Sequence, residues 1–237
     1  MSESNRLPTH IGFIMDGNRR WAKSRGLSTA QGHKAGANTL EHISEYCYQL
    51  GIRYITFYAF STENWSRPKA EISVLMTLFS QYLDSLLDRW KNSVKEIYHH
   101  TQVRFIGDLS LFDEKFREKV NTIYRNTDTA SVKLTMNIAI NYGGRSDIVQ
   151  AANQAISQGK TVLTEQDISE NLYTAGQPDP DLIIRTGGEM RLSNFMLWQA
   201  SYAEYYSDSV FWPDFDSSRL DLALNAYARR VRKFGGQ

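Results

Sequence analysis

The chain has little cysteine and almost no excess charge. Its single cysteine, Cys47, excludes an internal disulfide, and no cluster of cysteine and histidine has the spacing of a zinc site. We expect Cys47 to be a small, buried, apolar residue. The net charge of +1 gives no basis for nucleic-acid binding, so that any site for an anion must be local.

Long apolar runs are also missing. No run approaches the roughly 18 residues that a membrane-spanning helix needs. Residues 1–7 are polar and lack the apolar core of a signal peptide. We therefore expect a cytoplasmic protein.

The familiar motifs for nucleotides and for nucleophilic serine are absent. The sequence contains neither G-x-x-x-x-G-K-[ST] nor a G-x-G-x-x-G after a strand, which argues against nucleoside triphosphates and dinucleotides. It also lacks the G-x-S-x-G turn of serine hydrolases.

Strand-like and helix-like segments alternate along all 237 residues. Beside an opening strand that leads to Asp16, we expect strands at residues 53–60, 102–107, 132–141 and 182–185, and a sixth within 205–212. Helices are expected at residues 34–50, 69–100, 109–126, 147–159, 164–172 and 217–234, and residues 21–36, rich in glycine and serine, are expected to form a loop with at most short helical turns. This alternation predicts one α/β domain over residues 1–237 with a mainly parallel sheet.

The helix expected at residues 69–100 is unusually long. It contains neither glycine nor proline, and its full length would be about 48 Å at 1.5 Å per residue. Its apolar stripe would face either ordinary core or a cavity for an apolar ligand.

Polar residues gather where the expected strands end. Asp16, Asn18 and Arg20 follow the first strand, and Arg185 follows the fifth, just before a pair of glycines. The carboxyl ends of parallel strands meet at the edge of the sheet where ligands bind. Arginines beside a carboxylate predict a site for phosphate together with Mg²⁺. A phosphate site beside an apolar helix suggests a substrate with a charged head and an apolar tail.

Several long motifs resemble those of the cis-prenyltransferases, the undecaprenyl diphosphate synthase family. They are Ile14-Met15-Asp16-Gly17-Asn18-Arg19-Arg20-Trp21-Ala22, Gly32-His33-Lys34-Ala35-Gly36, Tyr58-Ala59-Phe60-Ser61-Thr62-Glu63-Asn64-Trp65-Ser66-Arg67-Pro68, Arg185-Thr186-Gly187-Gly188-Glu189-Met190-Arg191-Leu192-Ser193-Asn194-Phe195 and Trp212-Pro213-Asp214-Phe215. The resemblance covers nearly the whole chain.

The resemblance implies a six-stranded, mostly parallel sheet with helices around an apolar tunnel, in a homodimer. It implies a Mg²⁺-dependent condensation of isopentenyl diphosphate with an allylic prenyl diphosphate, in which each new double bond is cis. The product would resemble undecaprenyl diphosphate, a lipid carrier for cell-wall synthesis. Membrane contact would be peripheral at most, and driven by this apolar product.

The resemblance also assigns roles to residues. Asp16 would hold Mg²⁺ and help the allylic diphosphate to leave, and Glu204 would be a second metal contact, across the dimer. The allylic diphosphate would be lined by Gly17, Asn18, Arg19, Arg20, Trp21 and His33. Isopentenyl diphosphate would be bound by Arg185, Arg191, Leu192 and Ser193.

The motif at residues 58–68 would assist the removal of a proton. An amide is a poor base, so we interpret Asn64 as a group that orients a proton acceptor. It would act beside Ser61, Thr62 and Glu63, and Trp65 and Arg67 would complete the wall of the site.

Two departures from the family pattern stand out. Thr29 replaces an arginine, so either Arg25 or Lys34 substitutes for that cation or the chemistry is altered, as in the head-to-middle coupling that lavandulyl-type relatives perform. The helical region around residues 84–99 is longer than in familiar bacterial relatives. Small Ala59 would leave room for a growing chain, and candidate floor residues of the tunnel are Met76, Phe79, Leu83 and Met136.

Two further classes stay open from the sequence. A non-catalytic scaffold subunit is disfavoured because such subunits tend to lose the signature residues that remain here as Asp16, Arg185 and Arg191. An unrelated phosphate-ester enzyme is disfavoured by the long apolar helix.

Overall fold

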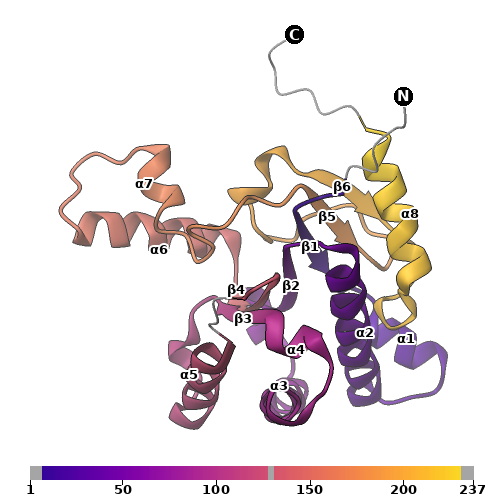
Figure 1. Cartoon of the computed structure of the whole chain (residues 1–237). Helices are drawn as coiled ribbons and strands as arrows, with labels where there is room; N and C mark the ends of the chain where they lie inside the picture. The colour runs from indigo at the N-terminus through magenta and orange to yellow at the C-terminus, as the bar shows by residue number, and fades with distance from the viewer. Residues whose placement is uncertain (1–6, 128–130, 231–237) are drawn as a thin grey trace.

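A computed structural model describes residues 7–127 and 131–230 of the chain. Its centre is one sheet of six parallel strands in the order β3-β4-β2-β1-β5-β6 (Figure 1). The strands are β1 (His10–Ile14), β2 (Tyr54–Ser61), β3 (Thr101–Ile106), β4 (Leu134–Tyr142), β5 (Leu182–Arg185) and β6 (Glu204–Ser207). The predicted α/β architecture is confirmed.

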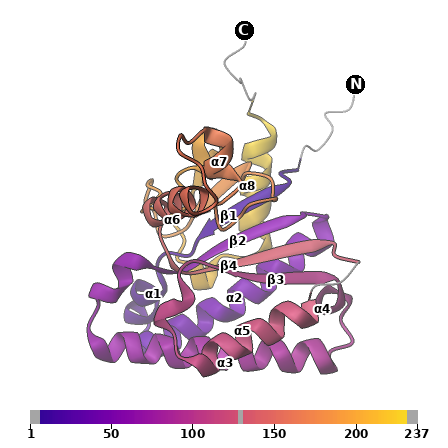
Figure 2. The same ribbon diagram turned by 90° about the vertical axis from the view of Figure 1, so that its left-hand side faces the viewer.

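Helices cover both faces of the sheet, which Figure 2 shows from the side. One face carries α2 (Thr29–Leu50), α3 (Lys69–Asn92), α5 (Glu114–Thr127) and α8 (Ser217–Ala228), with the short α1 (Asn18–Ser24) and α4 (Glu96–His100) beside them. The other side carries α6 (Gly144–Ser157) and α7 (Glu165–Ser169). Single turns of 3₁₀ helix lie at η1 (Thr62–Ser66), η2 (Leu109–Leu111), η3 (Gln199–Tyr202) and η4 (Trp212–Asp214).

The main core lies between the sheet and the layer of α2, α3, α5 and α8. Phe13 and Phe57 stack there on neighbouring strands, and Trp212 packs against both rings. All nine residues of β4 are buried, as expected for a strand covered on both faces. Cys47 lies fully buried in this core, as predicted, and burial raises the pKa of its thiol far above its ordinary value.

The order of the strands changes direction at β1. Strands β2, β4 and β3 lie on one side of β1, and β5 and β6, which come later in the chain, lie on its other side. Ile14 at the end of β1 lies in register with Arg185 at the end of β5. Such a switch point is where open parallel sheets bind ligands at the carboxyl ends of their strands.

The expected loop at residues 21–36 is wrong. The structure has α1 and the first two turns of α2 there, and α2 begins at Thr29 because Ser28 and Gln31 form a capping box. The glycines serve close packing between the two helices. A Cβ atom on Gly36 would lie 2.2 Å from Oδ1 of Asn18, and one on Gly32 would lie 2.4 Å from the carbonyl oxygen of Asn18.

The single helix expected at residues 69–100 is also wrong. Helix α3 ends at Asn92, where Ser93 adopts an extended backbone and its hydroxyl accepts a hydrogen bond from the amide of Lys95. Lys95, just after the break, pairs with Glu45 on α2 at 2.8 Å. The break contains neither glycine nor proline, so the local sequence does not predict it.

Smaller differences occur at element ends. The helix expected at residues 109–126 consists of η2 followed by α5, and the expected helix at residues 217–234 ends at Ala228. Residues 231–234 of this expected helix lie outside the described residues. Thr164 caps α7 as a helix start should.

Candidate active site

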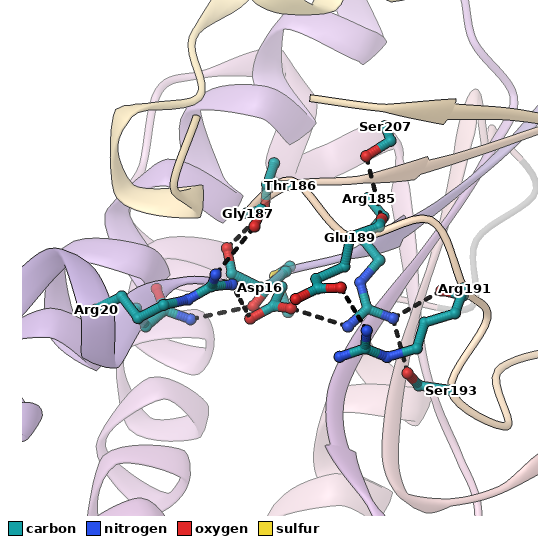
Figure 3. A network of polar contacts seen from close by, with 11 residues as sticks. Asp16, Arg20, Arg185, Thr186, Gly187, Glu189, Arg191, Ser193 and Ser207 are labelled. Atoms are coloured by element: carbon teal, nitrogen blue, oxygen red, sulfur yellow. Dashed lines mark hydrogen bonds and ion pairs between the residues drawn. The ribbon is translucent and has the colours of Figure 1, made fainter. Parts of the chain in front are cut away.

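Asp16 lies at the centre of a charged cluster at the carboxyl ends of β1 and β5 (Figure 3). Its Oδ2 accepts a hydrogen bond from Nη2 of Arg185 at 2.8 Å, and its Oδ1 accepts one from Nη2 of Arg20 at 3.0 Å. The side chain of Arg185 is only 9% exposed, whereas that of Asp16 is 28% exposed. The carboxylate is therefore held between two arginines and is still accessible from outside.

The charge of Asp16 is stabilised by these neighbours. Burial by itself would raise the pKa of Asp16, but the hydrogen bonds and positive charges of Arg185 and Arg20 outweigh it and hold that pKa below its ordinary value. Asp16 is thus an ionised carboxylate at neutral pH.

The backbone of Asp16 is fixed separately from its side chain. The hydroxyl of Thr186 donates to the carbonyl oxygen of Asp16 at 2.7 Å, and the amide of Trp212 donates to the same oxygen at 3.0 Å. Thr186 and Trp212 are both buried. Two elements that follow β5 and β6 therefore anchor the loop that follows β1.

The glycine pair after β5 lets Arg20 approach the strand ends. Nη1 of Arg20 donates to the carbonyl oxygen of Gly187 at 3.0 Å (Figure 3). Gly187 has a φ of +85°, and a Cβ atom there would lie 2.5 Å from Nη2 of Arg20. Any other residue at this position would be strained and would displace the arginine.

Arg185 also organises the loop that follows it. Its Nη1 donates to the carbonyl oxygen of Arg191 at 2.6 Å and to the hydroxyl of Ser193 at 2.7 Å. Ser193 has a φ of +49°, a left-handed conformation that is rare for serine and concentrates at functional sites. The side chain of Arg191 turns instead to Glu189, at 2.5 Å.

A cavity of about 1230 Å³ extends from this cluster into the molecule. Its mouth contains most of the predicted site residues, namely Asp16, Gly17, Asn18, Arg19, Arg20, His33, Ser61, Glu63, Asn64, Arg67, Arg185 and Ser193. Its inner part is apolar and is lined by Leu40, Ala59, Leu75, Leu78, Phe79, Leu83, Phe105, Ile138 and Ile140. The sequence-based expectation of a charged head site that leads into an apolar channel is met in one continuous space.

A bulge in β2 gives the cavity part of its width. The register between β2 and β4 shifts on both sides of Phe60, so that Ala59 has no residue opposite it. Ala59 lines the cavity, as expected for a small residue beside a growing chain. Phe60 does not line the cavity and lies buried against Trp65 and Phe79.

His33 lines the cavity as a neutral imidazole. Burial, assisted by the positive charges of Arg67 and Arg19, lowers its pKa from 6.5 to about 4. Its Nε2 is buried and has no hydrogen-bond partner within the described residues. A buried polar atom without a partner is uncommon in native proteins, and here it belongs to a residue that lines the cavity.

The loop after β2 forms another part of the mouth. Oδ1 of Asn64 accepts a hydrogen bond from the amide of Ser61 at 3.2 Å, which fixes the orientation of the Asn64 side chain. Oε1 of Glu63 accepts one from Nδ2 of Asn194 at 2.7 Å, which joins this loop to the one after β5. Arg67 pairs with Glu71 on α3 at 3.2 Å.

Some predicted residues do not line the cavity. Nε1 of Trp21 donates to Asp214 at 2.7 Å, and Nε1 of Trp65 donates to Asn141 at 2.8 Å, so both rings support the walls from behind. The cavity is also not lined by Thr62, Arg191 or Leu192.

Glu204 lies at the opposite end of the sheet from Asp16. It starts β6, pairs in register with Leu182 at the start of β5, and forms an ion pair with Arg230 at 2.5 Å. Within the described residues, no group of three or more histidine, cysteine, aspartate or glutamate side chains could enclose a metal. One chain therefore does not bring the two predicted metal contacts together.

The structure gives no support to the expectation that Arg25 or Lys34 replaces the cation at Thr29. Thr29 lines the cavity, but neither of these basic residues does. Arg25 is held by Asp214 at 2.9 Å and lies over the ring of Trp21. Lys23 lines the cavity instead.

Sequence reasoning missed three contributors besides Lys23. Thr186 anchors Asp16, Asn194 joins the two loops, and Tyr58 donates its hydroxyl to the carbonyl oxygen of Ser193 at 3.3 Å. All three belong to the motifs that resemble the family, and each is adjacent in the chain to a residue predicted to form the site or the channel. Their roles depend on contacts between distant loops, which spacing along the chain does not show.

The candidate floor residues divide into three groups. Phe79 and Leu83 line the main cavity, while Met136 lines a second cavity of about 50 Å³ that lies beyond it. Met76 lines neither. Tyr82, which sequence reasoning missed, lines both and so separates them.

Comparisons with known proteins agree with this site. The chain matches the family of undecaprenyl diphosphate synthases over residues 14–235. It is 47% identical over 232 residues to an isoprenyl transferase of Fusobacterium nucleatum, with 97% of this chain and 96% of the relative covered. It is 43% identical over 240 residues to a ditrans,polycis-undecaprenyl-diphosphate synthase of Photorhabdus laumondii that is specific for (2E,6E)-farnesyl diphosphate, covering 98% of this chain and 91% of the relative.

A solved structure extends the likeness to the fold. The lavandulyl diphosphate synthase of Lavandula x intermedia, in complex with dimethylallyl diphosphate, has a TM-score of 0.88 and 35% sequence identity, covering 97% of this chain and 98% of that one. This likeness covers nearly the whole of both chains, so the six-stranded α/β fold described above is the fold of that enzyme too. The chain belongs to the undecaprenyl diphosphate synthase family, the cis-prenyltransferases, as its motifs predict.

Proposed function

We propose that the protein condenses isopentenyl diphosphate with an allylic prenyl diphosphate to make a long cis-polyprenyl diphosphate. The observation that carries this proposal is the continuity between the charged mouth at Asp16 and the apolar cavity of about 1230 Å³. The two ends of that space match the two ends of a prenyl diphosphate. Ordinary small-molecule pockets span only about 300–1,000 Å³.

The charges at the mouth suit the departure of a diphosphate. As the allylic carbon–oxygen bond breaks, negative charge accumulates on the leaving group. Arg19 and Arg20 line the mouth next to Asp16, where they would stabilise this charge more strongly in the transition state than in the ground state. On the other side of Asp16, Arg185 and Ser193 would hold the second diphosphate and orient its alkene toward the allylic carbon.

The residues at the mouth fit a magnesium ion. Mg²⁺ keeps several waters and binds through one or two carboxylates together with substrate phosphates, so it does not need a complete protein cage. Asp16 offers a single, ionised and partly exposed carboxylate in such a position. When bound there with the substrate, Mg²⁺ would supply additional neutralisation of the leaving diphosphate.

Asn64 would serve the last step, in which the carbocation left after carbon–carbon bond formation loses a proton from the adjacent carbon and the new double bond forms. Its Oδ1 is occupied by the amide of Ser61, so its side chain is held in place at the mouth. We propose that Asn64 orients the group that accepts this proton. A diphosphate oxygen would be that acceptor, because an amide is a poor base.

The test is an incubation of the protein with isopentenyl diphosphate, Mg²⁺ and allylic primers of different lengths, with the products separated by chromatography. The proposal expects a ladder that ends in long chains and needs both substrates and the metal. Product from an allylic diphosphate alone would instead indicate head-to-middle coupling, the alternative that the likeness to lavandulyl diphosphate synthase favours. No turnover of any prenyl diphosphate would point to a scaffold subunit or to another phosphate-ester enzyme.

Tyr82 provides a prediction about product length. It separates the main cavity from the second one, which continues along the same helices and strands toward Leu86 and Met136. Tyr82→Ala should join the two spaces and shift the products to longer chains, because the growing chain would then reach beyond the present floor. Met76→Ala is the matched control, since Met76 lines neither cavity. Unchanged chain lengths in the tyrosine variant would remove Tyr82 from the floor of the tunnel.

We further propose that the active form is a homodimer in the cytoplasm. The distance of Glu204 from its own Asp16 across the sheet supports this, because Glu204 could serve as a metal contact only at the site of a second copy. Within residues 7–127 and 131–230, no helix is both long and apolar enough to cross a bilayer. Sedimentation of the pure protein tests the dimer, and mixing inactive Asp16→Ala with inactive Glu204→Ala subunits tests the sharing, since mixed dimers should recover part of the activity.

A further inference from the structure

The cations around the cavity differ in how far they are neutralised. The positively charged residues that line it are Arg19, Arg20, Lys23, Arg67 and Arg185. Arg20 and Arg185 share the carboxylate of Asp16, while Arg67 and Arg19 share that of Glu71 at 3.2 and 3.6 Å. Within the described part of the chain, Lys23 is the one cation of this set without a carboxylate partner.

This difference matters for a substrate that carries a diphosphate. Each pair of arginines keeps one net positive charge after its carboxylate is counted, and Glu63, which also lines the cavity, reduces the total further. A diphosphate group carries several negative charges, so the unneutralised ammonium of Lys23 is a large share of the positive charge that remains. An ion pair does not have to break before Lys23 binds an anion.

The position of Lys23 also suits this role. On α1 it follows Arg20 by three residues and Arg19 by four, a spacing that places all three side chains on neighbouring positions of the helix surface. Thr29, at the start of α2, lines the same cavity and offers no charge. A lysine has a flexible stem and three donors, so it can follow a ligand that an arginine fork fits in only one geometry.

We propose that Lys23 binds the allylic diphosphate, as an additional cation on the α1 side of the cavity mouth. This inference rests on the proposed function for the identity of the ligand, and on the charges and the cavity lining for the residue. Isopentenyl diphosphate, held on the side of Arg185, would not contact Lys23.

The kinetic test compares Lys23→Ala with Lys34→Ala. Lys34 is also exposed and lies near His33 in the chain, but it does not line the cavity. Lys23→Ala should raise the KM for the allylic diphosphate about tenfold, equivalent to about 1.4 kcal/mol, and leave kcat and the KM for isopentenyl diphosphate within about twofold. Lys34→Ala should leave all three constants unchanged.

Two rescue variants separate a binding role from a structural one. Lys23→Arg should restore the KM for the allylic diphosphate, and Thr29→Arg should restore it in the Lys23→Ala background by supplying a cation from the facing helix. The proposal is overturned if Lys23→Ala changes the KM by less than twofold, if Lys34→Ala has an equal effect, or if a charge at position 29 gives no recovery.

A second measurement does not depend on turnover. Calorimetric titration of the free protein with inorganic diphosphate should give weaker binding in Lys23→Ala than in wild type or in Lys34→Ala, and the difference should shrink at high salt because an exposed charge is screened. Equal binding in all three proteins, or no binding to any of them, would contradict the proposal. This titration therefore separates a failure of the Lys23 assignment from a failure of the proposed reaction.

Discussion

Two carboxylates beside this sheet are held in opposite ways. Asp16, after β1, is held by the charged groups of Arg185 and Arg20 and is open to a large cavity. Asp147, on α6, is fully buried and accepts hydrogen bonds from neutral donors, which are Tyr142, Gln150, the amide of Tyr173 and Gln199, at 2.9 to 3.1 Å.

The difference between these carboxylates shows how charge is used in the fold. The donors of Asp147 come from β4, α6, the segment after α7 and η3, so this carboxylate joins four parts of the chain on the α6 face of the sheet. Its lone pairs are used up by the protein. The arginines around Asp16 line a cavity and carry more N–H groups than Asp16 accepts from, and such donors are what an anionic substrate needs. The site at Asp16 therefore differs from the centre at Asp147 in the charge of its hydrogen-bond donors and in its access to a cavity, and not in burial alone.

The largest expected effect follows from Asp16→Ala. Turnover should fall by about 10³-fold or more, because the carboxylate that positions both arginines and the proposed metal is lost. The protein should stay folded, as judged by circular dichroism. Near-wild-type turnover would remove Asp16 from the centre of the mechanism.

Asp147→Ala should lower stability and leave turnover by the folded protein unchanged. Four donors, two of them in buried hydrogen bonds, would lose this acceptor, so the free energy of unfolding should fall by about 3 kcal/mol. The folded fraction should keep its kcat and its KM values, because Asp147 does not line the cavity. Denaturant titration measures the first effect and steady-state kinetics the second. If Asp147→Ala lowered kcat without lowering the free energy of unfolding, the proposed difference between Asp147 and Asp16 would be contradicted.

A smaller effect is expected for Thr186→Val, which keeps the shape of the side chain but removes its hydroxyl. The carbonyl oxygen of Asp16 would keep only the hydrogen bond from the amide of Trp212. We expect kcat to fall by roughly tenfold and stability by about 1 kcal/mol. Thr186→Ser should restore kcat. If stability alone changes, the hydroxyl supports the fold and does not position the carboxylate.

Much of the fold could be predicted from local patterns. The strand limits at residues 182–185 were found without error, because a short apolar run stands between proline and glycine turns. The long motifs identified the family and most of the residues that line the cavity mouth. In both cases the information lies in residues that are close together along the chain.

Other features depend on contacts that the sequence does not display. Gly32 and Gly36 look like loop residues, but they lie inside α2 because α1 packs against them. The roles of Lys23 and Tyr82 depend on the shape of the cavity. Tertiary packing overrides local preference at each of these places.

The pairing of β1 with β5 has a consequence for how the enzyme becomes active. Asp16 and Arg185 are separated by 169 positions in the chain, so their contact forms only after most of the protein has been made. Contacts of such long range are slow to form. A nascent chain that has already assembled β1 to β4 can enclose much of the apolar channel, yet it lacks the arginine that completes the anion site, so catalytic competence arrives only near the end of synthesis.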